Sequence, residues 1–391
     1  MTDSVQSLTD LLDRASARRF LDAPPPEDLG LAEHLPFPFL AMVGQPEMKL
    51  ALMLSLVNPN VGGVLLIGPR GTGKTTAVRS LADLMPDVDR SRCPYGCLPQ
   101  DVEAGGIDAI CPDCATRYAQ GEPLAFQDRV RLIDLPLNSQ LEDVVGGLDE
   151  RAALHQRLRL KRGLLAQADQ NILYVDEVNL LQDEIVDAIL DAAAQGTYSV
   201  RRGPIAATYR SRFVLVGSMN PEEGHLRPQI LDRFGLRVIV RGLESGEDRL
   251  EAYRRAIAFR NNPRQIVNAY QEATEIARLE VTEARRALPE VTLTEGAEQF
   301  GLEMIEQLGV DSLRAEITLF EAARAHAVAD GRDAAEPADV QKVAPMSLRL
   351  RQSAFMDDFF AQISSEEDKL RELIELDPSA TDPNNDSGDD K

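Results

Sequence analysis

Tryptophan is absent from this chain of 391 residues, and aromatic residues make up only 5% of it. Large planar ligands are bound mainly by aromatic and apolar contacts, so we expect no pocket for such a ligand here. No run of 18 apolar residues occurs, and we therefore expect no membrane span. The N-terminal stretch also lacks the apolar core of a secretory signal, which favours a cytoplasmic protein.

Basic residues are scarce relative to acidic ones. The chain has 42 Lys and Arg against 64 Asp and Glu, a formal charge of −22. Proteins that grip nucleic acid need the opposite balance, so no nucleic-acid partner is expected, although Arg201–Gly203 is a small basic stretch. The length allows one large or two medium domains, and a hydrophobic content of 43% supports a sizeable core.

Only four cysteines are present, and all of them fall within one short segment. Their spacing is C-x₃-C-x₁₃-C-x₂-C, two close pairs separated by a loop, which suits a tetrahedral Zn²⁺ thiolate site. Such a site has no open position, so the zinc would be structural. Reduced unliganded thiols and a redox disulfide remain open alternatives. The four residues are Cys93, Cys97, Cys111 and Cys114.

Short apolar runs that end in polar or small residues indicate a buried parallel sheet. They cover residues 62–68, 131–136, 171–177 and 212–220. Helical patterns separate them; in residues 180–196 the apolar side chains share one face and Gly196 is a stop signal, the apolar residues being Leu181, Ile185, Ile189 and Leu190. This alternation predicts a doubly wound α/β domain with its site at the carboxyl ends of the strands.

Four parts of the chain are expected. Residues 1–35 form a polar, partly helical lead-in, and residues 36–242 form the α/β domain with a Cys-rich insert at 90–120. Residues 243–350 read as a smaller helical domain, and residues 351–391 as a helix followed by an acidic, disordered tail.

The stretch "GPRGTGKTT" follows the first apolar run and fits G-x-x-x-x-G-K-[ST]. Glycines let successive backbone N–H groups surround phosphate oxygens, and the helix that follows directs its positive end at the anion. Lys74 is expected to bridge the β- and γ-phosphates and Thr75 to bind Mg²⁺. A chance glycine turn is the alternative. The predicted nucleotide-binding residues are Gly68, Pro69, Arg70, Gly71, Thr72, Gly73, Lys74, Thr75 and Thr76.

Two further strand ends carry polar residues. Asp176 can hold the magnesium ion, and Glu177 beside it can polarise an attacking water; an ordinary acidic cap is the alternative. Asn220 could orient that water, or it could simply begin a turn with Pro221.

Two arginines are candidates for stabilising charge on the transferred phosphate. Arg233 follows the third polar strand end and could reach a nucleotide across a subunit boundary, with a surface salt bridge as the alternative. Arg314 lies in the helical region, where an arginine on a helix surface is the alternative. The four scattered histidines read as structural or surface residues.

These elements, in this order, resemble the AAA+ ATPases, and more closely the family of ATPase I subunits of magnesium chelatase. The most specific part of the match, which covers about residues 36–350, is "NPEEGHLRPQILDRFG". The resemblance makes Asp176 and Glu177 the Walker B pair, Asn220 sensor 1, Arg233 the arginine finger and Arg314 the sensor 2 arginine. The adenine pocket would be lined by Met42, Val43, Gly44 and Gln45.

The family resemblance also implies two inserted hairpin-bearing segments, residues 137–170 and 195–213, the second with a turn at Gly203-Pro204. It implies an ATPase motor that drives Mg²⁺ insertion into protoporphyrin IX, as a ring that is usually hexameric. The partners would be a D subunit and a porphyrin-binding H subunit. Two alternatives share the ATPase motifs: a MoxR-type chaperone or metal-loading ATPase, and a DNA-remodelling AAA+ protein, which the charge disfavours.

Overall fold

The computed structural model describes residues 35–351 except for 149–159, 204 and 225. The expected lead-in at 1–35 and the expected tail at 351–391 therefore fall almost wholly outside the described residues, as does Pro204 of the predicted hairpin turn.

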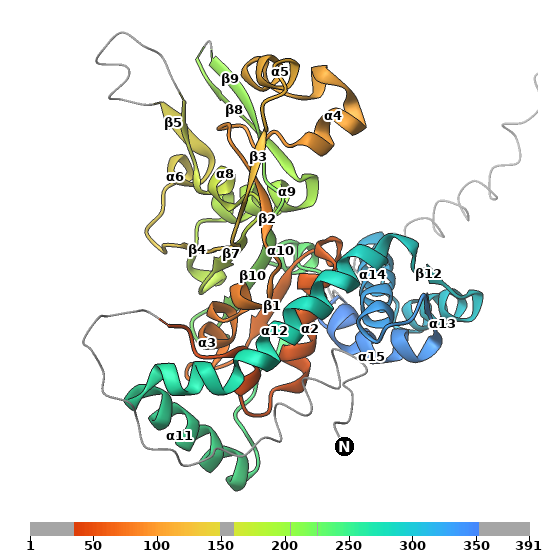
Figure 1. Ribbon diagram of the computed structural model, residues 1–391. Coiled ribbons are helices and arrows are strands. Elements are labelled where there is room, and N and C mark those ends of the chain that lie inside the picture. The colour runs from red at the N-terminus through yellow and green to blue at the C-terminus, as the bar shows by residue number, and fades with distance from the viewer. Residues whose placement is uncertain (1–34, 149–159, 204, 225, 352–391) are drawn as a thin grey trace, which may run out of the picture. The chain divides into compact units, whose positions relative to one another are not determined.

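A parallel sheet of five strands forms the centre of the α/β region, as predicted (Figure 1). The register brings together residues from distant parts of the sequence: Val64 pairs with Val216 on one side and Leu236 on the other. The four predicted strands are all present, and a fifth was missed because Arg237 interrupts its apolar run. In sheet order the strands are β11 (Leu236–Ile239), β1 (Val64–Ile67), β10 (Val214–Met219), β7 (Ile172–Val175) and β4 (Leu132–Leu135).

Successive residues along each strand point to opposite faces of the sheet, and each face packs on its own apolar cluster. In β1, Val64 and Leu66 join one cluster, whereas Leu65 and Ile67 join the other. Both faces are therefore buried along β1, β7 and β10, which explains why these strands read as continuous apolar runs.

Helices connect the strands. The predicted amphipathic helix is α9 (Asp183–Gln195), whose apolar face is buried and which ends at Gly196 in the left-handed conformation, as expected. The other helices of this region are α2 (Pro46–Val57), α3 (Lys74–Arg79), α6 (Leu141–Val145), α8 (Leu164–Ala168) and α10 (Pro228–Arg233).

In the described part of the chain, three antiparallel strand pairs lie outside the central sheet. The first is β2 (Val88–Ser91) with β3 (Ala125–Asp128), which brackets the cysteines, α4 (Pro99–Gly105) and α5 (Pro112–Ala119). The others are β5 (Gly146–Leu148) with β6 (Leu160–Arg162), and β8 (Thr197–Arg202) with β9 (Ile205–Arg210). The two expected inserted segments thus each contain a strand pair.

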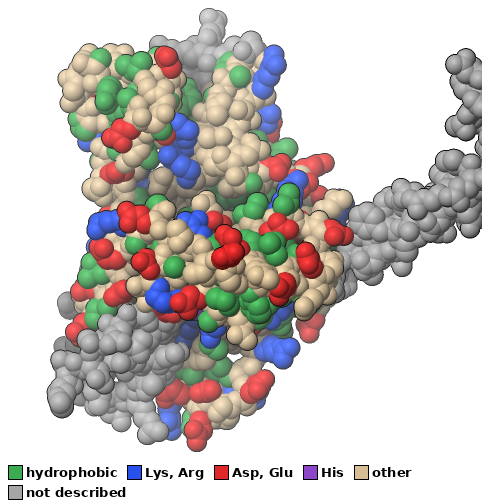
Figure 2. All heavy atoms as spheres, turned by 90° about the vertical axis from the view of Figure 1, so that its right-hand side faces the viewer, with side chains coloured by type: hydrophobic (Ala, Val, Ile, Leu, Met, Phe, Trp, Pro, Cys, Tyr) green, Lys and Arg blue, Asp and Glu red, His purple; other side chains and the backbone are tan. Residues whose placement is uncertain are grey.

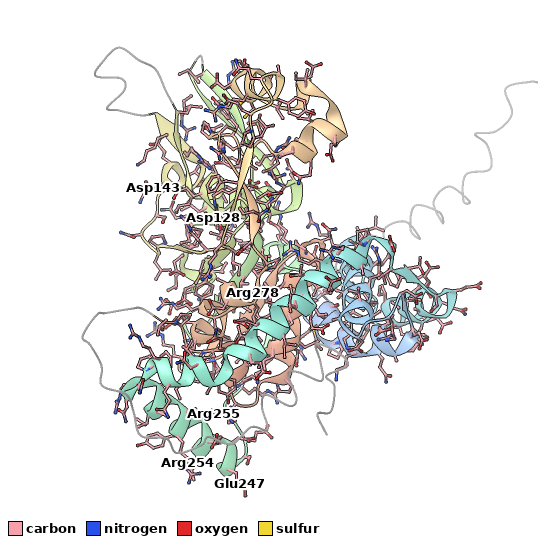
Figure 3. The ribbon with its side chains drawn as sticks, in the orientation of Figure 1. Asp128, Asp143, Glu247, Arg254, Arg255 and Arg278 are labelled. Atoms are coloured by element: carbon pink, nitrogen blue, oxygen red, sulfur yellow. The ribbon has the colours of Figure 1, made fainter. Side chains whose placement is uncertain are left out.

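The helical region shares an apolar cluster with one face of the sheet. Leu319 and Val281 belong to the same buried cluster as Val64. Arg278 donates two hydrogen bonds, of 2.9 and 2.8 Å, to the backbone oxygen of Asp83 in the α/β region (Arg278 is labelled in Figure 3). The elements are α11 (Gly246–Asn261), α12 (Pro263–Ala287), α13 (Glu295–Gln307), α14 (Leu313–Ala329), α15 (Pro337–Leu348) and the short strands β12 (Thr292–Leu293) and β13 (Ala334–Ala335).

Candidate functional site

The loop between β1 and α3 has glycine where it approaches neighbouring backbone closely and where its φ angles are positive. A side chain at Gly68 would place its Cβ 2.1 Å from the backbone oxygen of Val240, so only glycine fits there. Gly71 and Gly73 have φ of 81° and 87°, a region that favours glycine. The loop therefore exposes backbone N–H groups where a phosphate can approach.

Lys74 is the buried cation of this loop, with an exposed fraction of 9%. Its amine donates hydrogen bonds to the backbone oxygens of Gly68 at 2.7 Å and Pro69 at 2.8 Å. Burial lowers the pKa of Lys74, while the charges of Asp176 and Glu177 act to raise it. The hydrogen-bond partners of the ammonium are thus neutral carbonyl oxygens, which leave its positive charge able to attract an incoming anion.

A chain of hydroxyl groups joins the loop to Asp176. The hydroxyl of Thr75 lies 3.1 Å from that of Tyr174, which donates to Oδ1 of Asp176 at 2.8 Å. The hydroxyl of Ser218 donates to the same Asp176 oxygen. Tyr174 and Ser218 were not predicted from the sequence, although Tyr174 lies two residues before Asp176, which directly follows β7, and the two side chains therefore lie on the same side.

Glu177 faces the same loop from the end of β7. Its carboxylate accepts a hydrogen bond of 3.1 Å from Arg70, and its backbone N–H donates to the hydroxyl of Ser218 at 3.1 Å. Arg70 also pairs with Glu223, a second carboxylate that sequence analysis did not select. Its signal lay in the specific "NPEEG" run, which places an acidic residue just after the third strand end.

Asn220 is buried at the end of β10, with an exposed fraction of 4%. Its side-chain oxygen accepts a hydrogen bond of 3.3 Å from the N–H of Glu222, and its backbone oxygen accepts one of 3.1 Å from Glu223. The turn contact that the sequence left as an alternative is therefore made in the structure.

A cavity of about 390 Å³ opens beside the phosphate loop. Arg255 of α11, which is labelled in Figure 3, is buried at the wall of this cavity and donates a hydrogen bond of 3.0 Å to the backbone oxygen of Ala41. Gly44, with φ of 63°, lies beside this lining and packs against Leu243. The expected adenine-pocket residues and the loop meet here; the lining includes Met42, Val43, Gln45, Gly71, Thr72, Gly73 and Thr76.

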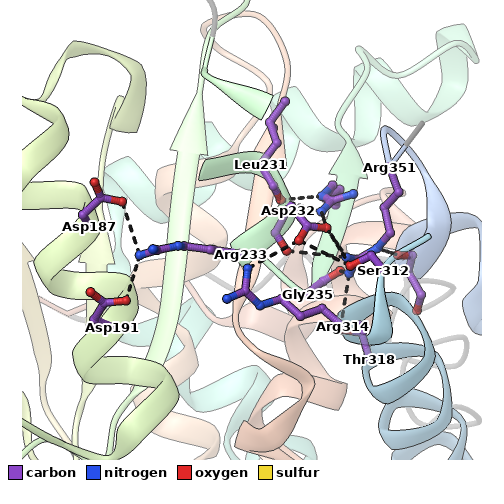
Figure 4. A network of polar contacts seen from close by, with 12 residues as sticks. Asp187, Asp191, Leu231, Asp232, Arg233, Gly235, Ser312, Arg314, Thr318 and Arg351 are labelled. Atoms are coloured by element: carbon purple, nitrogen blue, oxygen red, sulfur yellow. Dashed lines mark hydrogen bonds and ion pairs between the residues drawn. The ribbon is translucent and has the colours of Figure 1, made fainter. Parts of the chain in front are cut away.

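The two candidate arginines lie elsewhere and pair with different carboxylates (Figure 4). Arg233 forms ion pairs with two carboxylates of α9, Asp191 at 2.8 Å and Asp187 at 3.3 Å. Arg314 donates a hydrogen bond of 3.4 Å to Asp232. In the single chain, these guanidinium groups thus contact carboxylates rather than the phosphate loop.

A buried arginine, Arg237, contacts α10, the helix that carries Asp232 and Arg233. Arg237 of β11 has an exposed fraction of 0% and donates to the backbone oxygens of Leu231 and, at 2.7 Å, Arg349. Burial and the neighbouring Arg351 lower the pKa of Arg237 to about 9, so it stays protonated at neutral pH. Arg351 also pairs with Asp232, at 2.8 Å.

The four cysteines form one group, here called the thiol cluster: Cys93, Cys97, Cys111 and Cys114. Their sulfur atoms all lie within 4.8 Å of one another, and no disulfide joins them in the structure.

A separate group of one histidine and two acidic residues lies in the helical region, where Nδ1 of His326 is 2.6 Å from Oδ1 of Asp339. Burial acts to raise the pKa of Asp339, but hydrogen bonds from Arg332 and His326 hold it well below its usual value. His326 is thus buried and hydrogen-bonded within the helical region.

No helix among the described residues is both long enough and apolar enough to cross a membrane. On the face drawn in Figure 2, acidic side chains are interspersed with basic ones, and the described residues form no large basic surface there.

Comparison with known proteins places these features in one family. The profile of the MCM P-loop domain matches residues 146–242, and that of the AAA lid domain matches residues 305–373. The magnesium-chelatase subunit ChlI homolog of Methanocaldococcus jannaschii is 40% identical over 82% of this chain and 87% of its own length. The magnesium-chelatase subunit ChlI of Synechocystis is 40% identical over 81% of this chain and 88% of its own.

One solved structure is described as the complex between subunits BchI and BchD of magnesium chelatase. The matching chain is 39% identical, over 82% of this chain and 98% of that one, with a TM-score of 0.47.

Proposed function

Because this chain belongs to the family of magnesium-chelatase subunits ChlI, we propose that it is the ATP-hydrolysing motor subunit that drives Mg²⁺ insertion into protoporphyrin IX. One observation carries the ATPase assignment. The buried Lys74, the hydroxyl chain from Thr75 to Asp176, and Glu177 all converge on one glycine loop.

The residues of this loop fit ATP with Mg²⁺. Lys74 supplies the positive charge for the β- and γ-phosphates, and the backbone N–H groups after Gly71 and Gly73 supply donors. Thr75 and Asp176 would hold the Mg²⁺, which neutralises phosphate charge when bound. The cavity beside Val43 and Gln45 would take the adenine base.

Glu177 is the residue that we assign to positioning and deprotonating water. Its partner Arg70 is exposed and lies in the phosphate loop, so phosphate oxygens can compete for its guanidinium. Loss of that ion pair would leave the Glu177 carboxylate able to accept a proton. Asn220, at the adjacent strand end, would orient the same water.

Arg233 and Arg314 are assigned to a neighbouring subunit's nucleotide. Both flank Asp232 at the edge that carries α10, and both are paired there with carboxylates, which would hold them ready until another anion approaches. This arrangement supports action across a subunit boundary for both residues, in a homo-oligomeric ring that we propose is a hexamer.

The remaining partners follow from the family. We propose a D subunit that assembles with the ring, a porphyrin-binding H subunit that carries the tetrapyrrole, and a cytoplasmic location. ATP and Mg²⁺ are the cofactors of the motor. A structural Zn²⁺ at the thiol cluster would be additional to them and would take no part in hydrolysis.

The decisive experiment is reconstitution with D and H subunits, protoporphyrin and ATP, followed by the absorbance of Mg-protoporphyrin. The parent should form product, Glu177→Gln should bind ATP but form none, and Glu184→Gln should match the parent, because Glu184 is exposed on α9. If the parent hydrolyses ATP in the full complex but forms no Mg-protoporphyrin, the client is another protein and the chelatase assignment is wrong.

A further inference from the structure

The segment 92–124 has almost no apolar core of its own. Its small cluster contains three buried cysteines and only two buried aliphatic residues, Ile110 and Leu124. Burying so few side chains cannot offset the entropy of ordering about thirty residues, which is why small domains of this kind depend on a metal or on disulfides.

The four sulfurs of the thiol cluster are close enough together to form a tetrahedral thiolate site. Zinc–sulfur bonds of about 2.3 Å place the sulfurs about 3.8 Å apart, and the four sulfurs here already lie within 4.8 Å of one another. Backbone amides point at them: the N–H of Cys97 donates to Cys93 at 3.4 Å, and that of Cys111 to Cys97 at 3.3 Å. Donors aimed at sulfur favour the thiolate form that binds metal.

The same segment is packed against the β8–β9 strand pair. The ring of Tyr95, which lies between the first two cysteines, stacks on Tyr209 of β9 with centroids 5.5 Å apart, and Tyr209 stacks in turn on Tyr198 of β8. The N–H of Arg210 donates to the backbone oxygen of Tyr95 at 3.2 Å. The contact is therefore both apolar and hydrogen-bonded.

Ion pairs also join the segment 92–124 to the end of β9 and to the residues that follow it. Asp101 of α4 contacts Arg210 at 3.1 Å and Arg212 at 3.7 Å. Arg212 also donates to the backbone oxygen of Gly96 at 3.0 Å. Gly96 has φ of 81°, and a Cβ there would lie 2.9 Å from the Cβ of Arg210, so the turn between the cysteines fits closely only as glycine.

We propose that the thiol cluster binds one Zn²⁺, and that this ion holds the segment 92–124 as a brace that positions the β8–β9 strand pair. The metal joins the two cysteine pairs and so fixes the conformation of the segment. Tyr95 and Gly96 are then held in place against β9 and Arg212, and the ion pairs of Asp101 with Arg210 and Arg212 hold the end of the strand pair. The inference concerns a site outside the ATP loop and does not depend on the chelatase assignment.

The metal is tested on full-length protein purified without added metal. Elemental analysis should find about one zinc per chain, and replacement with Co²⁺ should produce the visible absorption of a tetrahedral thiolate complex. Cys114→Ser should lower the zinc content, while Asp101→Asn should leave it unchanged. Protein without zinc that also fails to bind Co²⁺, or that has fewer than four titratable thiols because of a disulfide, would overturn the metal site.

The brace is tested by hydrogen exchange of the backbone amides in residues 197–210. Removal of zinc, Cys114→Ser and Asp101→Asn should each speed exchange there by about tenfold or more, because the supporting contacts are lost. Asp113→Asn is the matched control, since Asp113 is exposed on α5, and the amides of β1 serve as an internal reference. Unchanged exchange at residues 197–210 after zinc removal would refute the brace even if zinc is bound.

Discussion

Replacing Arg233 with alanine distinguishes two roles for this residue: an ion-pair partner within its own chain, and an arginine that acts on a neighbouring subunit's nucleotide. The two roles predict losses of very different size. Within one chain, the change removes ion pairs to Asp187 and Asp191, whose side chains are 52% and 59% exposed. Exposed pairs contribute about 0–1 kcal/mol, so the free energy of unfolding should fall by less than about 1 kcal/mol. A donated arginine is worth about 10³–10⁵ in turnover, or about 4–7 kcal/mol of barrier.

The assay is steady-state ATP hydrolysis at subunit concentrations at which rings form, alongside urea unfolding of each variant. Arg227→Ala is the control, because Arg227 pairs with Asp183 of the same helix α9 and lies on the surface. It should retain near-parent turnover and stability, whereas Arg233→Ala should retain stability alone.

Mixing Arg233→Ala with Glu177→Gln sharpens the test. In a random equimolar ring, about a quarter of the interfaces would join an intact acceptor site to an intact finger, so up to about a quarter of the activity should return. Coupling around the ring could reduce that yield. If Arg233→Ala alone keeps near-parent activity, Arg233 is only a salt-bridge residue; if it is inactive and mixed rings form without recovery, Arg233 does not act across the subunit boundary.

Three further changes test other parts of the chain. Lys74→Ala should abolish measurable ATP binding in a fluorescent-nucleotide titration, because the phosphates lose their buried cation; retained affinity would contradict the loop assignment. Tyr174→Phe removes one hydrogen bond to Asp176, worth about 1.5–3 kcal/mol for a charged acceptor, so the Mg²⁺ concentration for half-maximal turnover should rise about tenfold or more; an unchanged Mg²⁺ dependence would show that this hydroxyl is not needed. The depressed pKa of Asp339 contributes stability that is present above its unfolded pKa of about 4 and is lost as pH falls. In urea unfolding, the difference between parent and Asp339→Asn should therefore shrink from about pH 6 to about pH 3, and a constant difference would show that the ion pair with Arg332 does not matter.

Local patterns predicted four of the five central strands. Of these, β1, β7 and β10 are short apolar runs buried on both faces, whereas β4 is a partly exposed run at the edge of the sheet. The fifth strand was missed because Arg237 lies inside it. Its guanidinium is satisfied by backbone oxygens of Leu231 and Arg349, which lie 6 and 112 positions away, and no local pattern reports such partners.

The candidate site likewise contains residues that sequence motifs identify and residues that only the fold brings together. Lys74 and Asp176 belong to contiguous motifs and could be selected from the sequence. Tyr174 and Ser218 could not, because their roles arise only when β7 and β10 pair in register and bring both hydroxyls to one carboxylate. Arg70 lay within the predicted loop, but its ion pair joins it to Glu177, which is 107 positions away.

The buried Arg237 makes a mechanical connection between two ends of the subunit. It ties the end of α10, which carries Arg233, to the backbone of Arg349, and Arg349 forms an ion pair with Glu47, two residues after Gln45 in the nucleotide cavity. A shift of the segment around Gln45 would therefore be transmitted to α10, which carries the arginine that we propose acts on a neighbouring subunit. Because Arg237 is itself a residue of β11, this connection runs through the edge strand of the central sheet.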